Sequence, residues 1–217
     1  MTYYSPTKTA QDVHDYVTRV FGDESGVQLT NADVIRWIND AQLSISDTNH
    51  VLPAKATMNV VAGTATYDLS AITPRIDEIA SLLLDGRRVG NIPVAQAEES
   101  ISLADPEGTE TGAPQFWYTW AGEVTFWPVP GQNYTMTIRY LAVPNEISSL
   151  EDTLSLPDDC FTDIVNYVLV KAYEMDENTE LMAAKAQELA QSLAERGEKE
   201  RSAQTMTYEK GITYELY

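Results

Sequence analysis

The chain has 217 residues, 43% of them hydrophobic and 22% charged, which is the composition of a globular protein and excludes disorder over most of the length. Fourteen Lys and Arg residues face 33 Asp and Glu residues, so the formal net charge is -19. Nucleic-acid binding through phosphate neutralisation needs a basic patch, and the longest basic cluster is only the pair Arg87-Arg88.

Two helices are predicted at the start of the chain. The first has apolar residues on one face and a glycine at its end: Val13, Val17, Val20, Phe21 and Gly22. The second starts after Thr30, a residue type that caps helices, and Asp33 complements its exposed amides. Its apolar stripe has helical spacing: Val34, Trp37, Ile38, Ala41 and Ile45.

The middle of the chain changes to an alternating, strand-like pattern. Residues 58–61 and 65–69 flank Ala62-Gly63-Thr64 and are predicted to form a hairpin. A strand over 76–84 ends at the turn dipeptide Asp85-Gly86. The remaining predictions are a short helix over 94–103, an exposed loop over 104–112, and strands over 116–120, 124–127 and 134–140.

Helical patterning returns after Pro157, with acidic residues in the first turn, and Asn178 can cap a further helix that becomes polar over 195–201. The last residues alternate apolar and polar positions without a helical period, which predicts an extended tail. A solvated terminus is normally poor in aromatics, so we expect the tail to bind a partner rather than to fold back onto its own helices. The candidate partner-binding residues are Met206, Tyr208, Ile212, Tyr214, Leu216 and Tyr217.

These patterns predict an α+β fold, in which an antiparallel helical bundle is interrupted by a small antiparallel β-rich insertion and followed by an extended C-terminal tail. The strands are too many, and lack the intervening helices, for βαβ units. The expected divisions are 1–54 and 151–201 for the two halves of the bundle, 55–150 for the insertion and 202–217 for the tail.

Residues capable of catalysis are few and isolated. His14 and His50 have no nucleophile or carboxylate at a motif spacing, and acidic residues surround Cys160, which disfavours a thiolate. No metal-binding or phosphate-cradling motif is present, so we expect no enzyme activity, no metal and no cofactor. A single cysteine fits a reducing cytoplasm, and we expect neither a secretory signal nor a membrane span.

An aromatic cluster leaves a second interpretation open. Trp117, Tyr118, Trp120, Phe126 and Trp127 can form a platform for a sugar ring. The chain would then be a carbohydrate- or surface-binding β module on a helical stalk. Cross-strand pairing and core filling explain the same residues without a ligand, and we favour that explanation.

Three stretches together resemble the head-to-tail adaptor proteins of tailed bacteriophages, which are also called connector, tail accessory or gatekeeper proteins. The first is Leu29 to Gln42, a capped helix that contains Trp37-Ile38-Asn39-Asp40-Ala41. The second is Phe126-Trp127-Pro128-Val129-Pro130 with the strand that ends in Arg139-Tyr140. The third is Leu156-Pro157-Asp158-Asp159 with the helix that runs through Tyr173. The resemblance covers roughly residues 8–200.

The resemblance implies a structural protein of the virion head-tail junction, made in the host cytoplasm, in a phage of the short-tailed kind. It implies a dodecameric ring below the portal that joins the portal to a downstream tail (nozzle) protein, with the tail residues docked on the portal. It also implies that DNA passes through the ring without sequence-specific binding.

Overall fold

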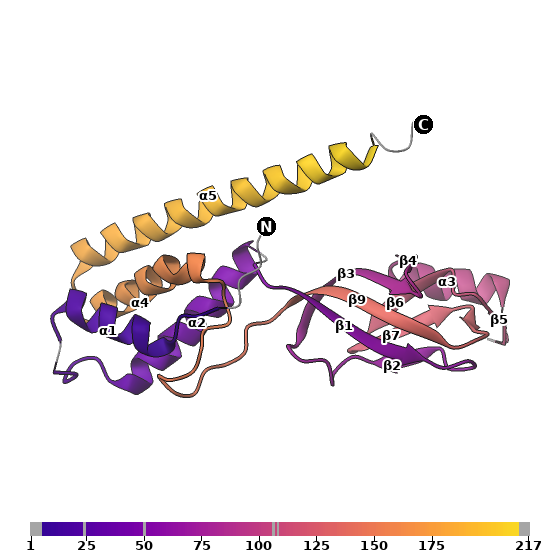
Figure 1. Cartoon of the computed structure of the whole chain (residues 1–217), viewed down its shortest axis with the longest axis horizontal. Coiled ribbons are helices and arrows are strands. Elements are labelled where there is room, and N and C mark those ends of the chain that lie inside the picture. Colours follow the sequence, from indigo (N-terminus) through magenta and orange to yellow (C-terminus); the bar gives the residue numbers. More distant parts are fainter. Residues whose placement is uncertain (1–5, 24, 50, 106, 108, 213–217) are drawn as a thin grey trace. The chain divides into compact units, whose positions relative to one another are not determined.

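The computed structural model describes residues 6–212 except 24, 50, 106 and 108, and the side chains among these as far as Glu198. The chain forms two compact units (Figure 1). Met1–Val51 and Pro144–Tyr217 form the first, here called the helical unit, and Leu52–Val143 form the second, here called the sheet unit. The fold class is therefore α+β, as predicted.

Within its described residues, the helical unit contains four α-helices and a 3-10 turn: α1 (Ala10–Phe21), α2 (Asn31–Asn49), η1 (Asp158–Cys160), α4 (Phe161–Met175) and α5 (Thr179–Ile212). Their ends follow the sequence signals. Gly22 adopts a left-handed conformation, with a φ of 89°, at the end of α1, and the Thr30 hydroxyl oxygen accepts a hydrogen bond from the Asp33 amide at the start of α2. The Asn178 side chain likewise accepts from the Leu181 amide and caps α5.

Helix α4 is the centre of this unit, because it contacts α1, α2 and α5. Its apolar face is buried, with Ile164, Val168 and Ala172 fully inaccessible to solvent. Tyr173 also lies against Phe21 of α1, with their ring centroids 5.6 Å apart. Figure 1 shows α5 running alongside α4.

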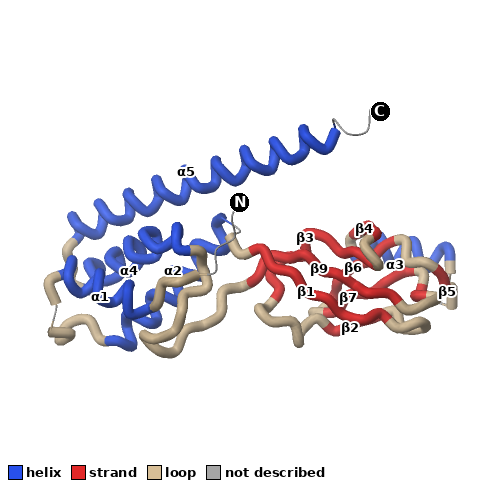
Figure 2. The backbone as a smooth tube through the Cα atoms, in the orientation of Figure 1, coloured by secondary structure: helices blue, strands red, loops and turns tan. Residues whose placement is uncertain are grey.

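The sheet unit is a large, curled sheet with one helix (Figure 2). Its elements are β1 (Pro53–Val60), β2 (Thr66–Asp68), β3 (Ile76–Leu84), β4 (Arg87–Asn91), α3 (Val94–Ala104), β5 (Thr111–Gly112), β6 (Phe116–Trp120), β7 (Glu123–Trp127), β8 (Val129–Pro130) and β9 (Tyr134–Ala142). Seven strands form the main sheet in the order β1-β9-β3-β4-β6-β7-β2, and β5 pairs with β8. All neighbours in the main sheet are antiparallel except β4 and β6.

Alternate side chains of these strands point into one apolar core. On β9, Met136, Ile138 and Tyr140 are buried, whereas Thr135 and Arg139, on the opposite face, are exposed. The Tyr140 hydroxyl donates to the carbonyl oxygen of Pro74 at 3.0 Å, and burial of its ring raises the pKa of Tyr140. The alternation thus assigns the strands of the main sheet an inner face in the core and an outer face.

Two sequence predictions need correction. Residues 58–61 and 65–69 do not form a hairpin, because β1 pairs with β9 and β2 pairs with β7. The chain still turns there, since the Tyr67 hydroxyl accepts from the Val61 amide and donates to the Val61 carbonyl. The extended tail predicted from residue 202 is also wrong as far as Ile212, because α5 continues to that residue. Residues 202–210 contain strong helix formers such as Ala, Gln, Met, Glu and Lys, and they prolong the helix.

Two tryptophans of β6 provide a matched test of this arrangement. Trp117 is 3% exposed and its indole N–H donates to the Val89 carbonyl, whereas Trp120 is 69% exposed. Trp117→Ala is expected to lower the free energy of unfolding by about 3–5 kcal/mol, and Trp120→Ala by less than about 0.5 kcal/mol. Urea unfolding followed by circular dichroism measures both. Equal losses in the two variants would contradict the assignment of inner and outer faces.

Candidate interaction surfaces

The candidate catalytic residues do not come together in one site within the described part of the chain. His14 is half-buried on α1, with its Nδ1 3.4 Å from the Asp15 carboxylate, and Cys160 is buried at the start of α4. His50 lies outside the described residues. No group of three or more His, Cys, Asp or Glu side chains among the described residues can hold a metal ion. No described helix has both the length and the apolar character required to cross a bilayer.

Polar residues of α2 form hydrogen bonds with the segment 144–156, which connects the sheet unit to α4. The side-chain amide of Asn39 donates to the Ile147 carbonyl, and its oxygen accepts from the Ile147 amide, both at 2.9 Å. One turn on, Gln42 is 1% exposed and accepts from the Ser155 amide at 2.6 Å. Both residues belong to the first stretch that resembles phage adaptors, so that stretch has a structural role.

The Leu156-Pro157-Asp158-Asp159 stretch has a similar role at the start of α4. The Asp158 carboxylate accepts hydrogen bonds from the Thr7 hydroxyl, from the Thr7 amide at 2.8 Å and from the Lys8 amide at 3.2 Å. These bonds tie the beginning of the described chain to η1. They favour the ionised carboxylate, with the Thr7 hydroxyl contributing most, and so hold the pKa of Asp158 below its ordinary value of 3.8.

The lowered pKa of Asp158 predicts a pH dependence of stability. A carboxylate whose pKa is lower in the folded than in the unfolded state contributes stability fully above pH 3.8 and loses it as the pH falls through the folded-state pKa. Asp158→Asn should therefore reduce the loss of stability on acidification. Asp40→Asn, on the exposed face of α2, is the control. Urea titrations at several pH values measure the effect, and identical acid profiles for wild type and Asp158→Asn would contradict it.

Arg196 holds α5 against the start of α4. Its guanidinium lies 2.9 Å from the Asp163 carboxylate and 3.0 Å from that of Asp159, and it also donates to the Asp159 carbonyl at 2.7 Å. The Asp163 side chain is only 1% exposed, so this is a largely buried ion pair. The next residue, Gly197, lies against α2, since a Cβ atom built there would be 3.4 Å from the Asn49 side-chain oxygen.

The rest of α5 is loosely packed. Between residues 179 and 198, none of its side chains is fully buried, and the apolar residues Met182, Leu189 and Leu193 are only half-buried. Burial of apolar area therefore contributes less to holding α5 than to holding α4. Arg196 adds a charged contact between α5 and the start of α4.

The predicted partner-binding residues fall at or beyond the end of this helix. Met206, Tyr208 and Ile212 lie on the last turns of α5, which follow the Arg196 contact. Tyr214, Leu216 and Tyr217 lie outside the described residues. The structure therefore groups three of the six on one helical segment, and their role in binding remains a prediction.

The aromatic residues of the sheet unit divide between core and surface. Trp117 and Phe126 belong to the core, whereas Trp127 stacks on Phe116 with ring centroids 5.2 Å apart. Only Trp120, at the end of β6, is largely exposed. A platform of all five aromatics is therefore not formed, because the two faces of the strands separate them.

A known protein family shares this sequence over most of its length. Residues 8–209 match the SU10 adaptor protein family. A search of curated proteins found no match. Since the matched residues cover nearly the whole length, the chain belongs to the SU10 adaptor protein family, an adaptor family of bacteriophages.

Proposed function

We propose that the chain is a structural subunit of the virion head-to-tail connector. In this proposal copies of the chain form a ring, dodecameric as in the proteins it resembles, below the portal protein. The ring joins the portal to the downstream tail (nozzle) protein and continues the DNA channel. The observation that carries the proposal is the family match over residues 8–209.

The long terminal helix supports an anchoring role for the end of the chain. Helix α5 has 34 residues and is therefore about 51 Å long, whereas α4 has 15. Residues 198–212 follow the Arg196 contact with the start of α4 and include Met206, Tyr208 and Ile212. Aromatic side chains are often the strongest contributors to protein interfaces. We propose that this part of α5 and the residues after it bind the portal.

The net charge supports the role of a channel component. At -19 per subunit, a ring of copies has a strongly negative field, and such a surface repels the DNA phosphates. The genome can then slide through the ring without being held. The proposal assigns the chain no catalytic step, since its work is binding.

A genetic experiment tests this function. A phage with an early stop codon in this gene should assemble DNA-filled heads that lack tails, and adding the purified chain to the lysate should restore tailed, infectious particles. Electron microscopy and plaque counts measure both results. Normal tailed particles from the mutant phage would refute the connector role.

A further inference from the structure

Four exposed charged side chains of the sheet unit, those of Lys55, Asp68, Glu123 and Arg139, form no ion pair with another described residue. Every ion pair among the described residues lies in the helical unit. The sheet unit nevertheless has basic residues at five positions: Lys55, Arg75, Arg87, Arg88 and Arg139. Its exposed charges are thus available to bind another molecule.

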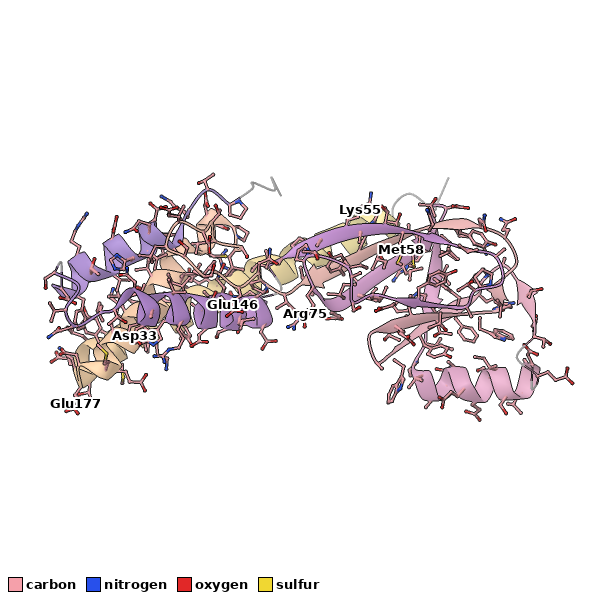
Figure 3. The ribbon with its side chains drawn as sticks, turned by 90° about the horizontal axis from the view of Figure 1, so that it is seen from below. Asp33, Lys55, Met58, Arg75, Glu146 and Glu177 are labelled. Atoms are coloured by element: carbon pink, nitrogen blue, oxygen red, sulfur yellow. The ribbon has the colours of Figure 1, made fainter. Side chains whose placement is uncertain are left out.

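Two of these basic residues face each other across neighbouring strands. Lys55 of β1 lies directly opposite Arg139 of β9, and both are exposed on the outer face. The adjacent residues Ile138 and Tyr140 point into the core, which confirms the direction of Arg139. Figure 3 labels Lys55 beside Met58, a residue of the same strand that packs against the core. We call Lys55 and Arg139 the basic row.

A second row of opposite charge lies at the other border of the sheet. Asp68 of β2 lies directly opposite Glu123 of β7, which in turn lies opposite Trp120 of β6. All three are exposed, and the neighbouring Val124 points into the core. We call Asp68, Glu123 and Trp120 the acidic-aromatic row.

Each row places two like charges opposite each other on neighbouring strands. Like charges directly opposite each other on neighbouring strands destabilise a sheet. Here one such pair is positive and the other negative, at the two borders of the strand order β1-β9-β3-β4-β6-β7-β2. A contact that brings the two rows together places each cation beside a carboxylate.

We propose that the basic row of one copy of the chain docks on the acidic-aromatic row of the next copy. Directly opposite residues on neighbouring strands have Cβ atoms about 4.5–5.5 Å apart. The two cations of the basic row therefore have the same spacing as the two carboxylates of the acidic-aromatic row, and each cation can contact one carboxylate. The Arg139 guanidinium can in addition lie over the indole ring of Trp120. The two partners use different surfaces, so the contact is head-to-tail, and such contacts close into rings when the rotation permits. The inference rests on the proposed ring and names the surfaces that form it.

Charge exchange between the rows tests the contact. One variant carries Lys55→Glu and Arg139→Glu, and the other carries Asp68→Lys and Glu123→Lys. Either variant alone should self-associate about 10- to 100-fold more weakly than wild type in sedimentation at low ionic strength, because like-charged rows then meet. An equimolar mixture of the two variants should associate again, since the first then has acidic side chains in both rows and the second has basic side chains in both rows. Full association of either variant alone, or failure of the mixture to recover, would overturn the proposal.

Controls separate this contact from general charge effects and from misfolding. Arg75→Glu with Arg87→Glu, and Glu98→Lys with Glu99→Lys, change the net charge equally at exposed positions outside the rows and should leave association unchanged. Asp68 also accepts hydrogen bonds from the Ser70 amide and hydroxyl, so Glu123→Lys alone is the safer acidic-row variant. Thermal unfolding checks that each variant folds.

A carbodiimide cross-link provides a second measurement on the wild-type chain. It should join Lys55 to Glu123 or Asp68 between ¹⁴N- and ¹⁵N-labelled copies, as identified by mass spectrometry. Absence of this intermolecular link, or binding of a sugar to Trp120 with no self-association, would overturn the inference. The connector function is tested separately. If the wild-type chain binds the portal and all charge variants still assemble, only the proposed contact is wrong. If the wild-type chain does not bind the portal, the connector function is wrong.

Discussion

Arg196→Ala is expected to lower the free energy of unfolding of the helical unit by about 3–5 kcal/mol, because it leaves the Asp163 carboxylate buried without its cation. Asp163 is 1% exposed, so in the folded chain its carboxylate depends on Arg196 for a charged partner. Amide hydrogen exchange should therefore become faster along α5, while the core strands of the sheet unit keep their protection.

Two comparisons show whether the buried pair causes this effect. Lys185→Ala removes an exposed pair with Glu188 on the same helix and should change stability by less than about 0.5 kcal/mol. Combining Arg196→Met with Asp163→Leu removes both charges and should restore most of the lost stability. An Arg196→Ala variant as stable as wild type would show that the ion pair does not hold α5.

Deletion of residues 202–217 is expected to leave a folded chain that no longer joins the portal. The contacts that hold α5 in its own unit, through Arg196 and Gly197, come before the deleted part. The deleted part contains the proposed anchors, including Tyr208 and Ile212. A dominant interface residue contributes about 2 kcal/mol, so loss of two should weaken portal binding by about a thousandfold.

Binding of the shortened chain to purified portal, measured by light scattering or surface plasmon resonance, checks this expectation. Tyr208→Ala with Ile212→Ala in the full-length chain should reproduce much of the loss without shortening the helix. If the chain without residues 202–217 binds the portal with normal affinity, these residues are not the anchor.

Signals that depend on a few neighbouring residues predicted the local structure well. Gly22 ends α1, Thr30 caps α2, and Asp85-Gly86 joins β3 to β4, with φ angles of 46° and 82° that suit a tight hairpin turn. Each of these features is decided within about four residues, so the sequence contains the necessary information.

Strand pairing was harder to predict because it depends on distant residues. The alternation over residues 58–61 shows that a strand exists but not that its partner is β9, more than 70 residues later. The parallel pairing of β4 with β6 covers only two residues, too few to produce a recognisable sequence pattern. The tail was assigned as extended because its apolar residues alternate, but helix propensity decided the conformation as far as Ile212.

The ion pair between Arg196 of α5 and Asp163 of α4 is not predicted from the sequence. Arg196 was grouped with the polar residues that follow it, although Leu189, Leu193 and Arg196 share one helix face. A single basic residue in line with leucines indicates a cation that faces another helix. The acidic residues at the start of α4 are its natural partners.

In the proposed function, copies of this chain form a ring on the portal. Negative-stain electron microscopy of the purified chain mixed with the purified portal of the same phage tests it most directly. The images should show an additional ring below the portal, coaxial with the DNA channel, with the symmetry of the portal. Portals without added density at saturating concentrations of the folded chain would contradict it.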